Sequence, residues 1–406
     1  MDIEQIQKDN PFHGNYIYIN TAAASAPPRQ VVNAIMDYLQ KTASLGPYLP
    51  AFRKDVYQKI DETRVKAGGF IGAKATEIAF VKNGTEGINF VANGLPWEEG
   101  DEIILADIEF HSNYTPWLKL RDTRKVSLRI IKTDESGVID VNLIAKQITK
   151  RTKLITVSHL PNASGALQEV EKICKLAKEN DVLTLINASQ TLGLVPIDVK
   201  ELDCDFLTAC GRKWLRGPEG SGILYIKESM VDSIEPTLVG WGGTSWDFET
   251  NDYHYSSTAK RVEAGCPIVP SILGLGAAID YAQNVGQENI FKKVAALTEY
   301  AVNQLSTIEG ISIYGPQDIK NRLGIIPFNV NGLLPDRITA YLEEKKVIIE
   351  SGTFMANTLL QQYGIDKMAR LSPHYFNTEE EIDLTVSHIK SLQKEEGKLD
   401  CRIDWK

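Results

Sequence analysis

The chain has 406 residues, of which 43% are hydrophobic and 24% charged, and its formal net charge is −9. This length predicts two domains, and the acidic charge argues against nucleic acid and anionic membranes as partners. No apolar run approaches the roughly 20 residues that span a bilayer, and the acidic N-terminus does not resemble a signal peptide. We therefore expect a cytoplasmic protein. Five scattered cysteines without CxxC spacing predict reduced thiols and no metal site.

Strand-like and helical patterns alternate along the first two thirds of the chain. A short strand-like run at 16–19 precedes a turn of small residues and helical patterns over 31–42 and 51–70. The expected strands that follow are 78–81, 102–105, 127–131, 154–157 and 183–186, and the expected helices are 86–95, 113–121, 141–149 and 170–180. This alternation predicts a mostly parallel sheet covered by helices.

After residue 264 the pattern changes to one typical of an α+β domain. The expected helices are 271–285, 289–308, 335–344 and 379–397, and the expected strands are 311–313, 322–330 and 347–350. We predict three parts: an N-terminal segment, 1–20, that packs with the small domain; a large α/β domain, 21–285; and a smaller C-terminal domain, 286–406.

One lysine, Lys213, lies between two apolar runs that we expect to be strands. A glycine-rich turn at 216–222 follows it, and its small residues let a bulky group approach the backbone. Desolvation and the positive charges of Arg212 and Arg216 would lower the pKa of Lys213, which suits the amine to covalent catalysis. The alternative is a surface lysine beside a tight turn.

Five stretches place polar or small residues directly after expected strands: 83–87, 109–113, 158–162, 187–190 and 210–213. Ligands of open α/β sheets bind at the carboxyl ends of strands, so these stretches can converge on one site. Gly84, Thr85 and Glu86 open a helix whose N–H groups can hold a phosphate. A helix cap without a ligand is the alternative for this stretch.

The order and residue types of these five stretches resemble the class V aminotransferase family of pyridoxal-phosphate (PLP) enzymes. That family includes cysteine desulfurases, isopenicillin N epimerases and C–S lyases, and the resemblance runs from about Tyr18 to about Ile389. It implies the aspartate-aminotransferase-like fold (fold type I), with a mostly parallel, seven-stranded type of sheet and a smaller α+β C-terminal domain. It also implies PLP as the cofactor, a small amino acid as the substrate, and a homodimer with shared active sites.

The resemblance assigns Lys213 the Schiff base with the cofactor. Phe110 takes the place of the ring that stacks on the pyridine, where desulfurases usually have histidine, and phenylalanine can pack but cannot transfer protons. The residues implied for cofactor binding are Gly84, Thr85, Glu86, Phe110, Asn162, Asn187, Gln190, Cys210, Arg212, Lys213 and Cys266.

Within that set, Asn162 and Gln190 match amides that donate to the cofactor's phenolic oxygen, and Arg212 can contact the phosphate bidentately. Cys210 stands where a serine is usual. Cys266 stands where a threonine is usual, in a loop that in relatives reaches the phosphate of the partner subunit, and that loop is what implies the shared dimeric site.

Arg370 matches the arginine that holds the substrate's α-carboxylate, for which a forked guanidinium is well suited. Ala23 and His111 complete the implied substrate-binding set. For His111 the alternative is a hydrogen-bonded structural histidine.

Two departures from the family pattern bear on the reaction. Met355 stands where desulfurases have their cysteine nucleophile, and a thioether cannot form a persulfide. Asn187 replaces the aspartate beneath the pyridine nitrogen, and a neutral amide stabilises a pyridinium less well. Both favour a C–S lyase that eliminates the β-substituent of a cysteine-derived amino acid. The alternatives are an epimerase or aminotransferase, and a catalytically degenerate PLP-binding protein.

Overall fold

A seven-stranded sheet forms the centre of the computed structural model, which describes residues 2–400. Its neighbouring strands are parallel except where β8 takes part, since β8 runs against both of its neighbours. In spatial order the strands are β2 (Ile78–Phe80), β8 (Gly222–Ile226), β7 (Phe206–Cys210), β6 (Leu183–Asn187), β5 (Thr152–Ser158), β3 (Glu102–Ala106) and β4 (Ser127–Ile131). The expected mostly parallel sheet is thereby confirmed.

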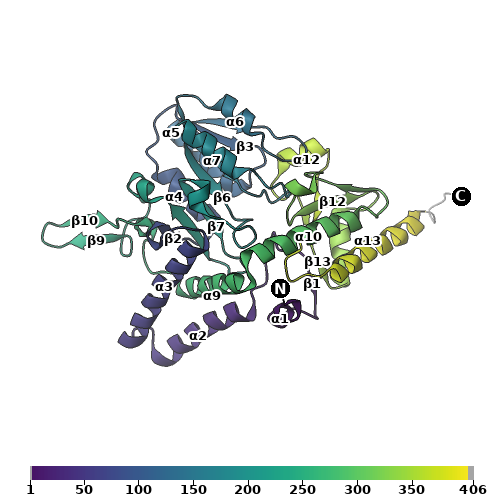
Figure 1. Cartoon of the computed structure of the whole chain (residues 1–406), viewed down its shortest axis with the longest axis horizontal. Helices are drawn as coiled ribbons and strands as arrows, with labels where there is room; N and C mark the ends of the chain where they lie inside the picture. Colours follow the sequence, from purple (N-terminus) through teal and green to yellow (C-terminus); the bar gives the residue numbers. More distant parts are fainter. Residues whose placement is uncertain (1, 401–406) are drawn as a thin grey trace.

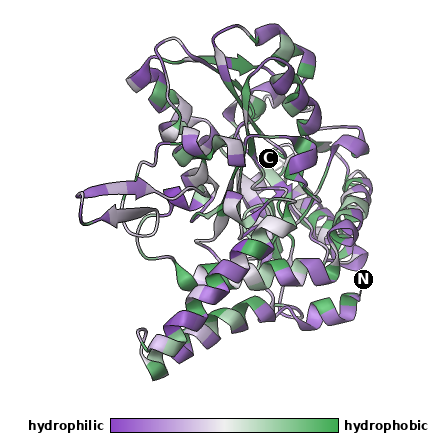
Figure 2. Cartoon of the chain, turned by 60° about the vertical axis from the view of Figure 1, so that its left-hand side comes forward, coloured by the Kyte–Doolittle hydropathy of each residue, from purple (hydrophilic) through white to green (hydrophobic). Residues whose placement is uncertain are grey.

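Helices cover the sheet (Figure 1), and its inner strands are accordingly buried along most of their length. All five residues of β3, β7 and β8 are buried. Figure 2 shows the same separation, with hydrophobic segments inside and mixed or hydrophilic helices outside. The helices of this part are α2 (Arg29–Leu45), α3 (Pro50–Phe70), α4 (Gly84–Gly94), α5 (Thr115–Arg124), α6 (Val141–Gln147), α7 (Val170–Glu179), α8 (Val199–Leu202) and α9 (Val269–Val285).

The C-terminal part is built on an antiparallel four-stranded sheet in the order β11-β12-β15-β14. Its strands are β11 (Ile311–Ile313), β12 (Ile326–Val330), β14 (Glu350–Gly352) and β15 (Met368–Leu371), and its helices are α10 (Gln287–Leu305), α11 (Pro335–Glu344), α12 (Asn357–Tyr363) and α13 (Glu379–Asp400). Gly286, at φ +90°, separates α9 from α10. Near the N-terminus, α1 (Ile3–Lys8) precedes β1 (Ile17–Tyr18), which pairs with β13 (Val347–Ile348).

Some features differ from the sequence-based expectation. The strand expected over 347–350 is divided, because β13 pairs with β1 while β14 turns to pair with β15. The hairpin of β9 (Thr244–Asp247) and β10 (Asp252–Tyr255) was not expected, and it projects away from the body of the molecule (Figure 1). It lacks a buried face, so the alternation of apolar and polar residues that marks a strand is weak there.

Short 3-10 helices connect several elements: η1 (Ala75–Glu77), η2 (His111–Asn113), η3 (Glu228–Ser233), η4 (Ala259–Val262) and η5 (Ile319–Asn321). Within residues 2–400 no helix is both long and apolar enough to cross a membrane. The cytoplasmic location stays a prediction. Four cysteines are free thiols, and the fifth, Cys401, lies outside the described residues.

Candidate active site

The carboxyl ends of parallel strands bring the predicted stretches together at one edge of the central sheet. Segments that follow β2, β3, β5, β6 and β7 all contribute to a single pocket there. Its lining residues are Asn83, Gly84, Thr85, Ile88, Phe110, Ser112, Ser158, Leu160, Asn162, Asn187, Ser189, Gln190, Cys210, Arg212 and Lys213. Residues up to 130 positions apart in the sequence, from Asn83 to Lys213, thus line the same pocket.

Lys213 follows β7 and extends over the ring of Phe110, with its Nζ 5.9 Å from the ring centroid. Burial lowers the pKa of Lys213 below its usual value, and the nearby charges of Arg212 and Arg370 lower it further. Cys210 and Glu350 act in the opposite direction. The amine has no ion-pair partner among the described residues, and its lowered pKa makes it easier to deprotonate than an exposed lysine.

Arg216 does not belong to this charge cluster, contrary to the sequence-based expectation. Its guanidinium is fully buried on the opposite side of the turn, where it donates to the Ala26 carbonyl, to the Tyr375 hydroxyl and to Asn10. A backbone φ of +63° turns it away from Lys213. Its role is to connect the N-terminal segment to the rest of the chain.

The N-terminus of α4 forms one end of the pocket. A Cβ atom at Gly84 would come within 2.6 Å of Ser189 Oγ, so a glycine is needed for the backbone to lie this close. Thr85 Oγ1 donates to Ser112 Oγ at 2.8 Å. The free N–H groups of the first helical turn and the positive end of the helix dipole favour an anion here.

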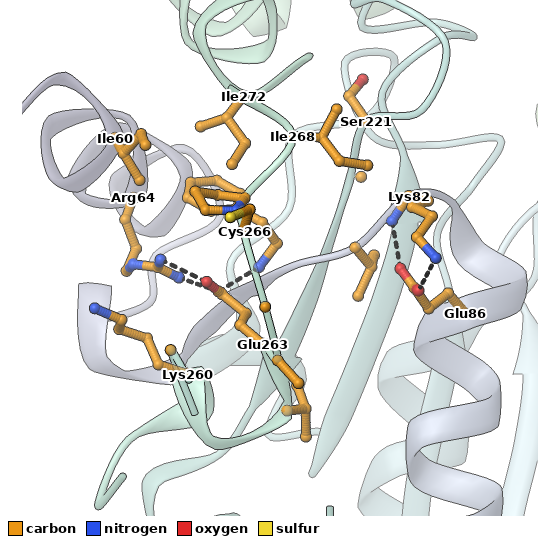
Figure 3. A pocket seen from close by; sticks show the side chains of 18 of the residues that line it. Ile60, Arg64, Lys82, Glu86, Ser221, Lys260, Glu263, Cys266, Ile268 and Ile272 are labelled. Atoms are coloured by element: carbon orange, nitrogen blue, oxygen red, sulfur yellow. Dashed lines mark hydrogen bonds and ion pairs between the residues drawn. The ribbon is translucent and has the colours of Figure 1, made fainter. Parts of the chain in front are cut away.

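The Glu86 side chain lies outside the lining of this pocket. Asn83 Oδ1 already accepts the Glu86 N–H at 2.9 Å, as a helix cap. The Glu86 carboxylate pairs with Lys82, through both its backbone N–H and its Nζ, in a second pocket (Figure 3). A carboxylate held there cannot assist an anion, so its contribution is to fix the start of α4.

The amides of Asn162 and Gln190 both line the pocket and are both anchored. Asn162 Nδ2 donates to the Phe354 carbonyl at 3.0 Å. Gln190 Nε2 donates to the Ala22 carbonyl at 2.9 Å, and its Oε1 accepts from Trp214 Nε1 at 2.8 Å. Because an amide nitrogen carries two hydrogens, each side chain keeps one donor for a ligand.

Arg370 lies on β15 with 2% of its surface exposed, and burial lowers its pKa to about 10. Nη1 donates to the Asn162 carbonyl at 3.0 Å, and Nη2 donates to Glu350 Oε2 at 2.5 Å from the directly opposite position on β14. The Phe354 ring lies 4.1 Å from the guanidinium carbon. A ligand carboxylate at Arg370 must therefore share the guanidinium with Glu350 or displace it.

Arg370 does not line this pocket, and neither do the remaining predicted residues, Ala23, His111 and Cys266. The Ala23 carbonyl accepts from Arg212 Nη1 at 2.7 Å, and His111 is exposed at the start of η2. Cys266 is exposed in the second pocket, which has a volume of about 220 Å³ and lies beside the Arg64–Glu263 ion pair (Figure 3). Within one chain, Cys266 and Lys213 thus face different pockets.

Comparison with known proteins decides the family. The sequence model described as aminotransferase class-V matches residues 17–385. The chain belongs to this family. A "probable cysteine desulfurase" of Methanothermobacter thermautotrophicus is 35% identical over 97% of this chain and 98% of its own length. The apo structure of a cysteine desulfurase from Thermococcus onnurineus superimposes with a TM-score of 0.91, at 33% identity over 96% of this chain and 98% of that one.

A more distant structural neighbour, described as the cystine C–S lyase C-DES, has a TM-score of 0.86 at 23% identity over 94% of this chain and 98% of its own. It shares the fold. PLP is the cofactor of the class V family, and the pocket fits it. The glycine at the start of α4 leaves space for a phosphate, Phe110 provides a flat ring, and Lys213 provides an amine of lowered pKa.

Sequence reasoning missed three residues that shape this site: Glu109, Glu350 and Phe354. Glu109 opens a stretch that the sequence did identify, yet its burial could not be read from its neighbours. Glu350 lies on β14 and Phe354 just after it, and their contact with Arg370 depends on a strand pairing that the sequence does not encode locally. The one available signal for Glu350 was its position just before the stretch around Met355, which the family resemblance places at the site.

Proposed function

We propose that the protein is a PLP-dependent C–S lyase that eliminates the sulfur substituent of a cysteine-derived amino acid. The observation that carries this proposal is the pairing of a lysine amine of lowered pKa in the pocket with a thioether, Met355, in the adjoining loop. The curated relatives named cysteine desulfurase support a sulfur amino acid as the substrate class.

When bound, PLP withdraws electron density from the substrate's α-carbon, which makes the α-proton removable and allows a β-substituent to depart. Lys213 acts as the general base that takes this proton, because its amine is neutral more readily than that of an exposed lysine. Arg370 binds the α-carboxylate through its forked guanidinium. Phe110 would provide the flat ring against which the cofactor packs.

Further residues fix the position of the cofactor in this proposal. The N-terminus of α4 at Gly84 and Thr85 binds the phosphate with help from Arg212. Asn162 and Gln190 donate their free amide hydrogens to the phenolic oxygen. In the dimer that we propose, Cys266 of each chain contributes to the site of its partner.

The net reaction balances without an oxidant or a reductant. The substrate RS–CH2–CH(NH3+)–COO− loses its α-proton, and the Cβ–S bond breaks with its electron pair leaving on sulfur. The thiolate takes up a proton, and water converts the remaining enamine to pyruvate and ammonium. Every proton that Lys213 accepts can be returned to the leaving sulfur or to carbon.

Met355 argues against the desulfurase reaction, which needs a thiolate to receive sulfur. The Met355 side chain is 60% exposed, and the backbone at both Phe354 and Met355 is left-handed, at φ +51° and +57°. Such conformations are unfavourable for residues other than glycine and persist where surrounding contacts impose them. Here the Asn162–Phe354 hydrogen bond and the Phe354–Arg370 contact hold the loop at the site.

Product analysis separates the candidate functions. Purified holoprotein is incubated with cysteine, cystine, S-alkyl cysteines and alanine, and pyruvate, alanine and ammonium are measured. A lyase forms pyruvate from the sulfur compounds alone. Alanine as the product would show a desulfurase. Conversion of L-alanine to D-alanine would show an epimerase, and pyruvate formed from alanine only when a second keto acid is added as amino acceptor would show an aminotransferase. Retained PLP with no turnover of any compound would show a degenerate site, which Asn187 would explain.

Met355→Cys provides the matched gain-of-function test. If Met355 occupies the position of a sulfur-accepting residue, the new thiol should divert part of the product from pyruvate to alanine. An unchanged product ratio would show that this loop does not reach the leaving sulfur.

We propose a homodimer, and also the domain division 1–20, 21–285 and 286–406. The pairing of β1 with β13 supports the placement of the N-terminal segment with the small domain, and Gly286 between α9 and α10 supports the boundary. Exposed apolar side chains around the second pocket, including Leu238, Trp241 and Ile268, support the dimer.

A further inference from the structure

Glu109 is a buried carboxylate next to the pocket that the proposed reaction does not use. It follows β3, and only 4% of its surface is exposed. Three donors converge on it: the Ser158 N–H at 2.7 Å, the Ser158 hydroxyl at 2.5 Å and Asn113 Nδ2 at 2.7 Å. Each carboxylate oxygen of Glu109 therefore accepts at least one hydrogen bond from the protein.

The hydrogen bonds continue from Glu109 to Asn187 in the pocket wall. Asn187 Nδ2 donates to Ser158 Oγ at 3.2 Å, and Asn187 Oδ1 accepts from the Ser189 N–H at 3.1 Å. A hydroxyl has one hydrogen. Because the Ser158 hydroxyl donates this hydrogen to Glu109, its oxygen can only accept a hydrogen from Asn187. The amide nitrogen of Asn187 therefore points towards Ser158.

Burial raises the pKa of Glu109 to about 7, and the hydrogen bonds from Ser158 and Asn113 oppose this rise. No charged side chain of the described residues pairs with Glu109. His159, which adjoins Ser158 in the sequence, is kept neutral because burial lowers its pKa to about 4. Behind Asn113 lies the uncharged Thr156, whose hydroxyl donates to Asn113 Oδ1 at 3.0 Å.

We propose that Glu109 is a positioning residue that controls, through Ser158 and Asn187, whether the cofactor's pyridine nitrogen keeps its proton. This rests on the proposed function only in that Asn187 faces that nitrogen. With Glu109 ionised, the Asn187 oxygen retains a lone pair that can accept the pyridinium N–H. With Glu109 protonated, its hydroxyl donates to Ser158, whose own hydrogen then turns to Asn187. The Asn187 amide rotates to accept this hydrogen through its oxygen, and it then presents Nδ2, a donor, to the ring nitrogen.

Glu109 and the ring nitrogen are thereby coupled: when one of them is protonated, protonation of the other becomes less favourable. An ordinary pyridine loses its proton as the pH rises. In this site the ionisation of Glu109 near neutral pH favours the protonated ring, so the proton is retained. A buried carboxylate two hydrogen bonds away thus compensates in part for the amide at position 187.

The test is the nitrogen-15 chemical shift of the cofactor ring nitrogen, recorded on holoprotein loaded with labelled PLP, from about two pH units below to two above 7. We expect a protonated ring in the natural protein above the Glu109 pKa. Glu109→Gln donates to Ser158 at every pH, and should lower the pyridinium pKa by about one unit or more, a tenfold change in protonated fraction. Ser158→Ala breaks the chain of hydrogen bonds at its middle, so in that background Glu109→Gln should no longer change the ring signal.

Thr156→Val is the matched control, because it removes a hydroxyl from the same buried cluster while leaving Glu109, Ser158 and Asn187 in place. Its spectrum should match that of the natural protein. Asn187→Asp in the Glu109→Gln background should restore the protonated signal. A natural-type signal in Glu109→Gln would overturn the proposal, as would an equal loss in Thr156→Val or an effect of Glu109→Gln that persists in the Ser158→Ala background. The measurement needs no turnover, so a missing lyase activity leaves it interpretable.

Discussion

At the residue scale, the site contains a buried cation that is neutralised before any substrate arrives. A buried guanidinium without a counter-charge is costly, and Glu350 supplies that charge to Arg370 from the facing strand. The Glu350 side chain is 40% exposed, so it can turn into solvent when a substrate carboxylate replaces it. Glu350 therefore competes with the substrate for the same donors.

Glu350→Gln should tighten the binding of amino acids to the holoprotein, because the substrate carboxylate no longer displaces a charged competitor. We expect about a tenfold lower Kd, equivalent to about 1.4 kcal/mol, for S-methyl cysteine titrated against the cofactor absorbance. Glu344→Gln, an exposed change on α11, serves as the control. Weaker binding in Glu350→Gln would mean that Glu350 holds Arg370 in its binding position rather than competing with the ligand.

Lys213 is the residue on which the proposed reaction depends most. Lys213→Arg keeps the positive charge, but a guanidinium does not deprotonate in proteins, so the general base is lost. We expect turnover to fall by about 10²–10⁴-fold or more, measured as pyruvate formation, while the circular dichroism spectrum stays unchanged. Residual pyruvate at the natural rate would place the proton transfer on another group.

At the scale of elements, the sequence predicted where strands end, but it did not predict which residues face one another across paired strands. The alternation of helical and strand patterns predicted the parallel sheet, and with it the convergence of Gly84, Phe110, Asn162, Asn187 and Lys213. These residues follow strands directly, so their location depends on local sequence plus one rule of sheet topology. The direction of the Arg216 side chain depends on its backbone φ angle, and the contact between Glu350 and Arg370 depends on strand pairing. Both are set by the whole fold.

The N-terminus of α4 gives a prediction about an element. Gly84→Ala places a methyl group 2.6 Å from Ser189 Oγ, so the helix start must shift away from the pocket. We expect PLP to bind at least about tenfold more weakly, measured by equilibrium dialysis, with little change in thermal stability. Gly69→Ala in α3 meets no atom within 4 Å and should bind PLP normally. Equal affinity in both variants would show that the phosphate lies elsewhere.

At the scale of the whole molecule, the chain exposes more surface than its mass explains. Its accessible surface is 18784 Å², whereas a compact monomer of 45.1 kDa would expose roughly 15,700 Å². Several of its most exposed apolar side chains lie on the projecting hairpin and around the second pocket, among them Trp246, Phe248 and Trp241. Patches of this kind usually mark an interface, and obligate dimers bury surfaces of comparable size, roughly 1,000–2,500 Å² per partner.

Ile268→Asp tests whether this surface joins two copies of the chain. Ile268 is 43% exposed at the rim of the second pocket (Figure 3) and is the N-cap residue of α9. An aspartate is favoured at such a cap, so the variant should fold while its charge opposes burial. We expect a dimer for the natural protein and a monomer for Ile268→Asp in sedimentation at micromolar concentration, with pyruvate formation falling alongside. Leu334→Asp, which changes a 75% exposed apolar residue just before α11, should remain dimeric. If Ile268→Asp stayed dimeric and active, the partner subunit would have to dock on another face, and Cys266 could not reach a neighbouring site.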